Sequence, residues 1–272
     1  MNDLIINPKT KRNIDYYLNN PTHAVLFHGQ NGLGVDTIAL DTARKLAGNQ
    51  ILLIKPDEKG KIGVDIVRKD ILKLVSNRQN ERFAVVINDA DTMTIDAQDT
   101  LLKVLEEPVN NVHFILSAHN KAKLLPTMRS RTQMIEVLPV SPDKTADILK
   151  NIKITVDKRQ KITFLATGKP AETFRLVNEE EYYRNMAVVA EYAKKFISGK
   201  TLDRLKIVSV IKKRDEAKTF VQTIANLLLF LTNKREIPNM AEKLDVVSSV
   251  ADNLRQNGNI RAQMTYLATN FG

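Results

Sequence analysis

Residues 29–37 read GQNGLGVDT and have the glycine spacing of a phosphate-binding loop, G-x-x-G-x-G-K-[ST]. In that motif the lysine neutralises the β- and γ-phosphates, and the hydroxyl residue holds Mg²⁺. Here a hydrocarbon stands at the lysine position and a carboxylate, which would repel phosphates, stands at the hydroxyl position. We therefore expect a vestigial phosphate loop that does not bind ATP. Its residues are Gly29, Gly32, Gly34, Val35 and Asp36.

A second degenerate site follows the β-prone run at residues 83–88. A working site of this kind, a Walker B strand, ends in an Asp that holds Mg²⁺ beside a Glu that orients water. One register places Asn88 at the metal position and Asp89 at the water position. The other places Asp89 on the metal and Ala90 at the base. Either register impairs hydrolysis. The alternative is that Asp89 and Asp91 only cap the next element.

Buried strands and amphipathic helices alternate through the first half of the chain. Apolar runs without polar alternation predict strands covered on both faces, as in a doubly wound parallel α/β sheet. Apolar residues at helical spacing predict the helices between them. The predicted strands are residues 24–28, 51–55, 83–88, 112–117 and 134–137, and the predicted helices are 35–47, 66–75 and 95–106.

Prolines at 139 and 142 mark a domain boundary. We expect an α/β nucleotide-binding-like domain over 1–139, a small helical lid domain over 140–178, and a helical collar, or oligomerisation, domain over 179–272. Breaks such as Gly199, Pro238 and Gly258 separate the later helices. These helices are predicted over 142–151, 157–166, 171–178, 181–198, 201–212, 215–233, 239–256 and 260–271.

One apolar stripe in the C-terminal part lies at helical spacing. We interpret it as core packing of a helical bundle, and the alternative is a seam between subunits. Its members are Phe220, Ile224, Leu227, Leu228 and Leu231.

Composition excludes several classes of protein. The 272 residues contain no cysteine, which rules out disulfides and thiolate metal sites. No apolar stretch reaches the ~20 residues of a membrane span, and the first ten residues show no signal-peptide core, so we expect a cytoplasmic protein. The net charge of +10 is spread along the chain, and it indicates contact with a polyanion only weakly.

Three further blocks carry a family resemblance. Residues 97–108, AQDTLLKVLEEP, closely resemble the A-Q-N-A-L-L-K-x-L-E-E-P helix of clamp-loader AAA+ subunits. Residues 114–117 resemble the sensor 1 strand of that family, and residues 124–132, LLPTMRSRT, resemble its L-P-T-[IL]-x-S-R-C motif. The resemblance implies an AAA+ α/β domain, a helical lid and a collar that joins five subunits.

Within that family, the pattern of losses resembles the delta-prime type of subunit, which does not hydrolyse ATP. Arg131 matches the arginine that such subunits insert in trans into the ATP site of a neighbour, and its alternative is a structural salt bridge. Arg129 is interpreted as ordinary surface or interface charge. The sensor 1 position falls near Ala118, beside His119 and Asn120. Ala171 occupies the place of the sensor 2 arginine.

The resemblance also implies partners. They are the gamma/tau ATPase subunits and the delta subunit of a DNA polymerase III clamp loader, with the sliding clamp and primed DNA reached through the assembly.

We expect no cofactor and no metal. The four-cysteine zinc module carried by many members is absent. The four histidines show no metal-ligand spacing and are interpreted as ordinary core or surface residues. They are His23, His28, His113 and His119.

Two other functions remain open at this point. One is an active P-loop ATPase, in which Lys45 or Lys103 would have to replace the missing lysine. The other is a stand-alone DNA-binding protein, supported by the positive charge alone.

Overall fold

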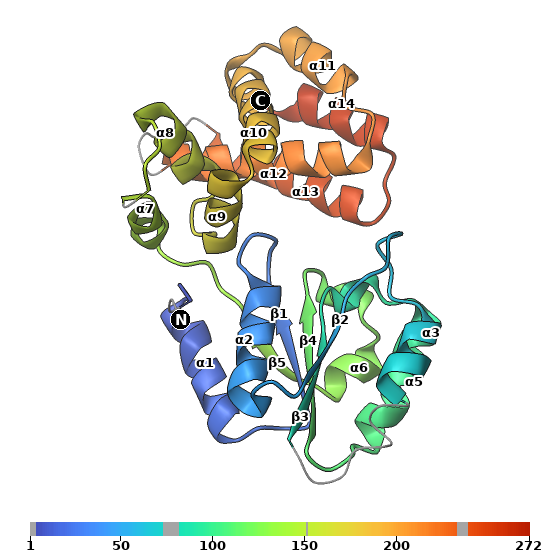
Figure 1. Cartoon of the computed structure of the whole chain (residues 1–272). Coiled ribbons are helices and arrows are strands. Elements are labelled where there is room, and N and C mark those ends of the chain that lie inside the picture. Colours follow the sequence, from blue (N-terminus) through green and yellow to red (C-terminus); the bar gives the residue numbers. More distant parts are fainter. Residues whose placement is uncertain (1–3, 73–81, 151, 233–238) are drawn as a thin grey trace. The chain divides into compact units, whose positions relative to one another are not determined.

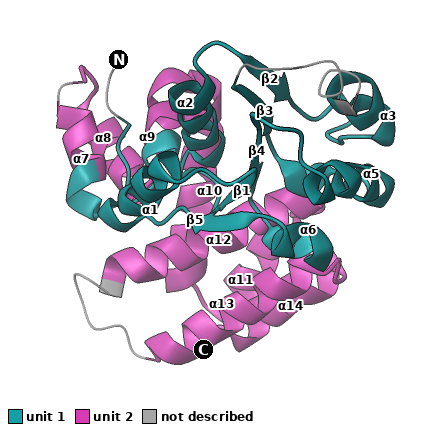
Figure 2. Ribbon diagram, turned by 90° about the horizontal axis from the view of Figure 1, so that it is seen from below, with its two compact units in different colours: residues 1–144, 168–172 teal, residues 145–167, 173–272 magenta. Residues whose placement is uncertain are grey.

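The computed structural model describes residues 4–72, 82–150, 152–232 and 239–272. It separates into two compact units (Figure 2), and the predicted three-domain division stays a prediction. Unit 1 is Met1–Lys144 with Gly168–Glu172, and unit 2 is Thr145–Thr167 with Thr173–Gly272. Six predicted positions lie outside the described residues: 73–75 of the helix predicted over 66–75, the last residues, 151 and 233, of the helices predicted over 142–151 and 215–233, and the break at Pro238.

Unit 1 is built on one parallel sheet of five described strands, in the order β2-β3-β4-β1-β5 (Figure 1). Strands β1 and β3 are buried along their whole length, as their continuous apolar runs predict. The predicted doubly wound α/β fold is therefore confirmed. The strands are β1 (Ala24–His28), β2 (Ile51–Ile54), β3 (Phe83–Ile87), β4 (Val112–Ala118) and β5 (Gln133–Glu136).

Helices cover both faces of this sheet (Figure 1). Alternate residues of β1 divide between two cores: Val25 and Phe27 pack with α1 and α2, whereas Ala24 and Leu26 pack with the elements of the opposite face. The first face carries α1 (Pro8–Asn19) and α2 (Val35–Ala47). The opposite face carries α3 (Val64–Ile66), the π-helical turn η1 (Val67–Leu72), α5 (Ile95–Glu106) and α6 (Pro126–Ser130).

Helix α1 is an element that the sequence analysis does not predict. Asn7 caps it by accepting a hydrogen bond from the Lys9 amide (2.9 Å), and Pro8 occupies its first turn. Its buried Thr10 donates to the Glu136 carbonyl and accepts from the Leu138 amide, both at 3.0 Å. These two bonds attach the helix to the edge strand β5 and the segment after it.

Unit 2 consists of helices in its described part, and one continuous apolar core joins them. Phe196 lies at the centre of this core, with its ring edge-to-face against Phe220 and Phe271. The helices are α7 (Pro142–Lys150), α8 (Val156–Leu165), α9 (Pro170–Asn178), α10 (Glu180–Ser198), α11 (Thr201–Ser209), α12 (Arg214–Thr232), α13 (Met240–Arg255) and α14 (Ile260–Asn270). The first three residues of α7 and the first three of α9 belong to unit 1.

The apolar stripe of α12 packs in this core. Phe220, Ile224, Leu227 and Leu228 are buried, which confirms the core interpretation for these four, and Leu231 is partly exposed. Among the described residues, no helix has both the length and the apolar character that a bilayer crossing requires.

Buried Gln98 connects α5 to the loop that precedes α6. Its side-chain amide donates to the carbonyls of Met93 (3.3 Å) and Lys123 (3.2 Å), and its Oε1 accepts from the Leu125 amide at 2.8 Å. Three bonds from one buried side chain satisfy backbone groups in two loops. Gln98 therefore fixes the start of α6, the short helix that Arg131 follows.

We predict that Gln98→Leu lowers the free energy of unfolding by roughly 1–3 kcal/mol, because it leaves the partly buried Leu125 amide without its acceptor. Urea unfolding followed by circular dichroism measures the change. Asp99→Leu, which introduces the same side chain at the next, exposed position of α5, is expected to change stability by less than about 0.5 kcal/mol. Equal effects of the two substitutions would contradict the positioning role of Gln98.

Candidate functional site

The carboxyl ends of β1, β3 and β4 bring three loops of unit 1 together. In the sheet register, His28 of β1 is paired with Ala118 of β4, and the Gly29 amide donates to the Ala118 carbonyl at 3.2 Å. Residue 88 directly follows β3, which pairs with β4 on its other side. This edge of a parallel sheet is where open α/β folds bind ligands, and the predicted site residues of both degenerate motifs lie along it.

The predicted phosphate loop turns at two glycines with positive φ. Gly32 and Gly34 have φ of +86° and +83°, conformations that side chains rarely adopt, and Gly34 caps the N-terminus of α2. Val35, at the lysine position, is only 1% exposed and belongs to the core between α2 and the sheet. The residue that replaces the lysine therefore packs inside the protein.

Asp36 supplies a negative charge in the first turn of α2. The N-terminus of a helix attracts anions because its first amides are unpaired and the helix dipole is positive there. In a working site a phosphate would use this attraction, whereas here a side chain of the protein does. The Ser117 hydroxyl donates to Asp36 Oδ1, and Ser117 Oγ accepts from the Asp89 amide at 3.1 Å.

The two residues after β3 have different surroundings. Asn88 Oδ1 is buried without a hydrogen-bond partner. Asp89 has a φ of +51° and precedes the 3-10 helix η2 (Ala90–Thr92), but its side chain makes no capping bond, so the capping alternative is wrong for Asp89. The Asp91 carboxylate accepts from the amides of His119 (3.1 Å) and Asn120 (3.2 Å) and thereby fixes the loop after β4.

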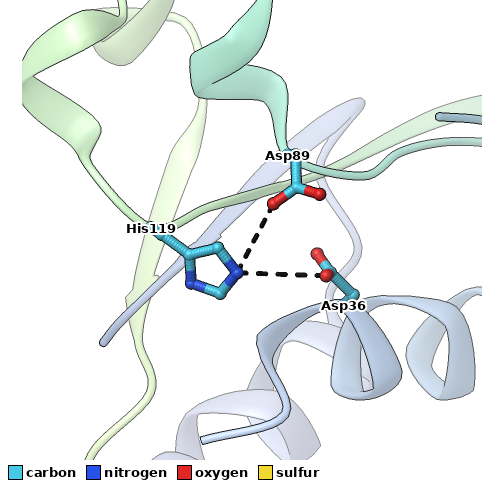
Figure 3. Close-up of side chains that lie close together, drawn as sticks. All are labelled: Asp36, Asp89 and His119. Atoms are coloured by element: carbon cyan, nitrogen blue, oxygen red, sulfur yellow. Dashed lines mark ion pairs between the residues drawn. The ribbon is translucent and has the colours of Figure 1, made fainter. Parts of the chain in front are cut away.

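His119 lies between the two carboxylates (Figure 3). Its Nε2 is 3.4 Å from Asp89 Oδ1 and 3.9 Å from Asp36 Oδ2. Its Nδ1 is 3.2 Å from the carbonyl oxygen of Gly29. Burial raises the pKa of Asp89 above its ordinary value, and the charge of Asp36 raises it further. The His119 ring lowers this pKa, and Asp91 raises it. The cluster is thus an arrangement of like charges around one imidazole.

Residues 168–172 pack against the phosphate loop within unit 1. The Glu172 amide donates to the Gly32 carbonyl at 3.0 Å, and a Cβ placed on Gly32 would lie 2.8 Å from the Glu172 Cβ. The side chain of Lys169 comes close to the same point. Its burial lowers its pKa, and Glu172 opposes that shift. Ala171, at the expected sensor 2 position, approaches Gly34. The chain's own residues thus pack against the glycines of the loop.

Arg131 ends the short helix α6 and is engaged by its own chain. Its Nη2 is 2.7 Å from Glu106 Oε1, and its Nη1 donates to the Thr127 carbonyl at 3.2 Å. Its side chain is nevertheless 35% exposed, so both the salt bridge and access from outside are present. Arg129 differs, since its Nε is buried without a partner.

Sequence reasoning missed several residues that shape this site. Gln98 lies in the family-like helix but carried no recognised role. Ser117 and His119 reach the site only because β4 pairs with β1 and β3, and Glu172 reaches it through a turn about 140 residues from Gly32. The order of strands in the sheet is what places Ser117 and His119 at the site. Local spacing of residues does not reveal that order.

Comparisons with known proteins find sequence relatives and solved structures that are similar to this chain. The protein family described as DNA polymerase III, delta subunit matches residues 48–141. A replication factor C small subunit from Haloarcula marismortui is 26% identical over 217 residues, covering 76% of this chain and 63% of the relative. Replication factor C small subunit 1 from Pyrobaculum aerophilum is 24% identical over 277 residues, covering 91% and 83%.

Two solved structures from Thermotoga maritima share the fold. A DNA polymerase III gamma subunit-related protein has a TM-score of 0.53 and 20% identity, with 97% of this chain and 98% of the other covered. The RuvB Holliday junction branch migration motor has a TM-score of 0.50 and 15% identity, with 70% and 75% covered. At these identities the likeness shows that the fold is shared.

In sequence, the chain is similar to the DNA polymerase III delta subunit family over residues 48–141 and to replication factor C small subunits over a larger part of its length.

We predict that Gly32→Ala destabilises the protein more than Gly34→Ala does. Both substitutions put a Cβ on a positive-φ residue, which costs roughly 1–2 kcal/mol. Only at Gly32 does that Cβ meet a rigid neighbour at 2.8 Å, which adds roughly 1–3 kcal/mol. Chemical unfolding of both variants measures the difference, and equal losses would show that Glu172 does not pack against the loop.

Proposed function

We propose that this protein is a non-hydrolysing clamp-loader subunit of the DNA polymerase III holoenzyme, of the delta-prime type. It would assemble with the gamma/tau ATPase subunits and the delta subunit and support ATP-driven loading of the sliding clamp on primed DNA. It would donate Arg131 in trans to the ATP site of a neighbouring subunit. Its own phosphate loop would bind no ATP and need no cofactor.

The closed phosphate loop is the observation that carries this proposal. Glu172 packs on Gly32, and Asp36 supplies the negative charge at the N-terminus of α2. A triphosphate would therefore meet a carboxylate where a working loop offers a lysine and a hydroxyl. Burial of Val35 supports the same conclusion, because a lysine at that position would have to leave the core.

The setting of Arg131 supports a role on another chain's phosphate. A guanidinium stabilises the charge that spreads over a transferring phosphoryl group, and it needs no phosphate loop of its own to do so. Gln98 fixes the start of α6, and the bonds of Arg131 to Glu106 and Thr127 hold the guanidinium in one place while 35% of the side chain stays exposed. Such preorganisation lowers the cost of engaging a partner.

The two lysines that the active-ATPase alternative would need, Lys45 and Lys103, lie outside the phosphate loop. Lys45 lies in the last turn of α2, at the opposite end from the phosphate loop, and pairs with Asp41 at 2.7 Å. Lys103 is an exposed residue in the last turn of α5. Neither residue is placed to supply the positive charge of the lysine whose position Val35 occupies.

We predict that Arg131→Ala lowers ATP turnover by a clamp loader reconstituted from this chain with gamma/tau and delta subunits. An arginine finger is worth about 10³–10⁵ in rate at the site that it serves, so turnover at that one site should be lost. Steady-state ATP hydrolysis with clamp and primed DNA is the measurement, and circular dichroism verifies the fold.

Glu106→Gln is the matched control. It removes the salt bridge but keeps the guanidinium and its bond to the Thr127 carbonyl, so turnover should fall far less than in Arg131→Ala. If Arg131→Ala leaves turnover unchanged, or if Glu106→Gln reduces it equally, Arg131 is a structural residue and the proposed role is wrong.

A further inference from the structure

The cluster of Asp36, Asp89 and His119 has the geometry of a metal-binding site that does not depend on a nucleotide. One imidazole nitrogen and an oxygen from each carboxylate all lie within 4.8 Å of one another. The three side chains come from the first turn of α2, the residues after β3 and the loop after β4, and they point toward a common centre (Figure 3).

The hydrogen bond at Nδ1 of His119 determines whether Nε2 can act as a metal ligand. Nδ1 is 3.2 Å from the Gly29 carbonyl oxygen, which is an acceptor only, so Nδ1 carries a proton. In the neutral ring, Nε2 then presents a lone pair to two carboxylates at 3.4 and 3.9 Å. Three groups with electron pairs directed at one point repel one another unless a positive charge or a proton lies between them. That partner is either a proton, on the ring or on the Asp89 carboxyl, or a metal ion.

The contacts around the cluster are those of a metal site. Histidine ligands of metals commonly donate their other N–H to a backbone carbonyl, as His119 does to Gly29. Ser117 donates to one oxygen of Asp36 and leaves the other, Oδ2, directed at the ring. Asp91 holds the backbone of His119. The ligand atoms are therefore oriented by neighbours before any ion binds.

Distances and exposure fit a first-row divalent ion. Ligands at the 2.0–2.1 Å typical of zinc are about 3.4 Å apart in a tetrahedron, which is the separation of His119 Nε2 and Asp89 Oδ1. Asp36 Oδ2 would have to move about half an ångström closer to Nε2 to reach the same spacing, and the three ligand atoms all lie within 4.8 Å of one another. The three side chains are 26–35% exposed, which leaves access for the ion and for water.

We propose that Asp36, Asp89 and His119 bind one divalent transition-metal ion of the zinc class in the absence of nucleotide, with water completing the coordination. The single imidazole ligand favours zinc-class ions over Mg²⁺, which prefers oxygen ligands in octahedral geometry. The ion would neutralise the two carboxylates and connect α2 to the loops after β3 and β4. This inference concerns the chain alone and does not rest on the proposed clamp-loader function.

Isothermal titration calorimetry of the full chain, freed of metal by a chelator, tests the site with Zn²⁺ and with Mg²⁺. We expect one Zn²⁺ per chain and binding of Mg²⁺ at least 100-fold weaker. Asp36→Asn, Asp89→Asn and His119→Gln should each weaken Zn²⁺ binding at least tenfold. His113→Gln removes a histidine outside the cluster and should bind Zn²⁺ like the wild type.

A second measurement needs no variant. Co²⁺ bound to the wild-type chain should shift one exchangeable imidazole N–H resonance in the proton NMR spectrum, because Nδ1–H is held by Gly29 while Nε2 binds the ion. If Zn²⁺ does not bind stoichiometrically, the cluster holds a proton in place of a metal ion, and the proposal is wrong. Binding that persists in His119→Gln, or that is lost equally in His113→Gln, would also overturn it.

Discussion

The negative charge of Asp36 at the N-terminus of α2 is the constraint on which the rest of the site depends. Two like charges 4 Å apart repel by about 4 kcal/mol at the effective dielectric of a protein surface. A triphosphate in this loop would place several charges at such a distance. The attraction of the helix end, which a nucleotide-binding protein uses for phosphate, is directed here to a carboxylate held by Ser117.

Other features of unit 1 agree with a site that does not handle a nucleotide. Val35 packs in the core, Ala171 occupies the expected sensor 2 position, and Glu172 bonds directly to Gly32. The segment that carries Arg131, in contrast, is held by several side-chain bonds. Gln98 and Glu106, both from the family-like helix α5, hold the segment that carries it. The chain thus lacks the lysine and the hydroxyl of a working phosphate loop, whereas the residue proposed as the arginine finger is held in place by its own chain.

The sequence predicts those parts of the fold that local periodicity encodes. Helices α2 and α5 have the predicted bounds because their apolar faces, their start signals and the stop of α5 all lie within the segments themselves. Helix α1 was not predicted, since few of its residues are apolar and its attachment to β5 is made by a buried threonine. The predicted strand bounds are close to the observed ones, because continuous β-branched runs leave few alternatives.

The candidate site was predicted only in part from the sequence. The glycine spacing and the residues at the lysine and hydroxyl positions identified the loop and its losses. His119 was placed beside the sensor 1 position but interpreted as an ordinary residue, because the four histidines show no metal-ligand spacing. It lies 30 positions from Asp89 and 83 from Asp36 in the sequence. Only the strand order, with β4 between β3 and β1, brings the three together. Contacts set by sheet topology leave no local spacing for a motif to reveal.

Equilibrium binding of Mg-ATP to the purified chain tests the central claim most directly, because it needs no partner. Isothermal titration calorimetry should detect no binding at millimolar nucleotide, and ³¹P resonances of ATP should be unchanged by the protein. Binding with a micromolar dissociation constant that is lost in a Gly32 or Gly34 variant would contradict the account, since it would place a triphosphate in a loop that we describe as closed by Glu172 and Asp36.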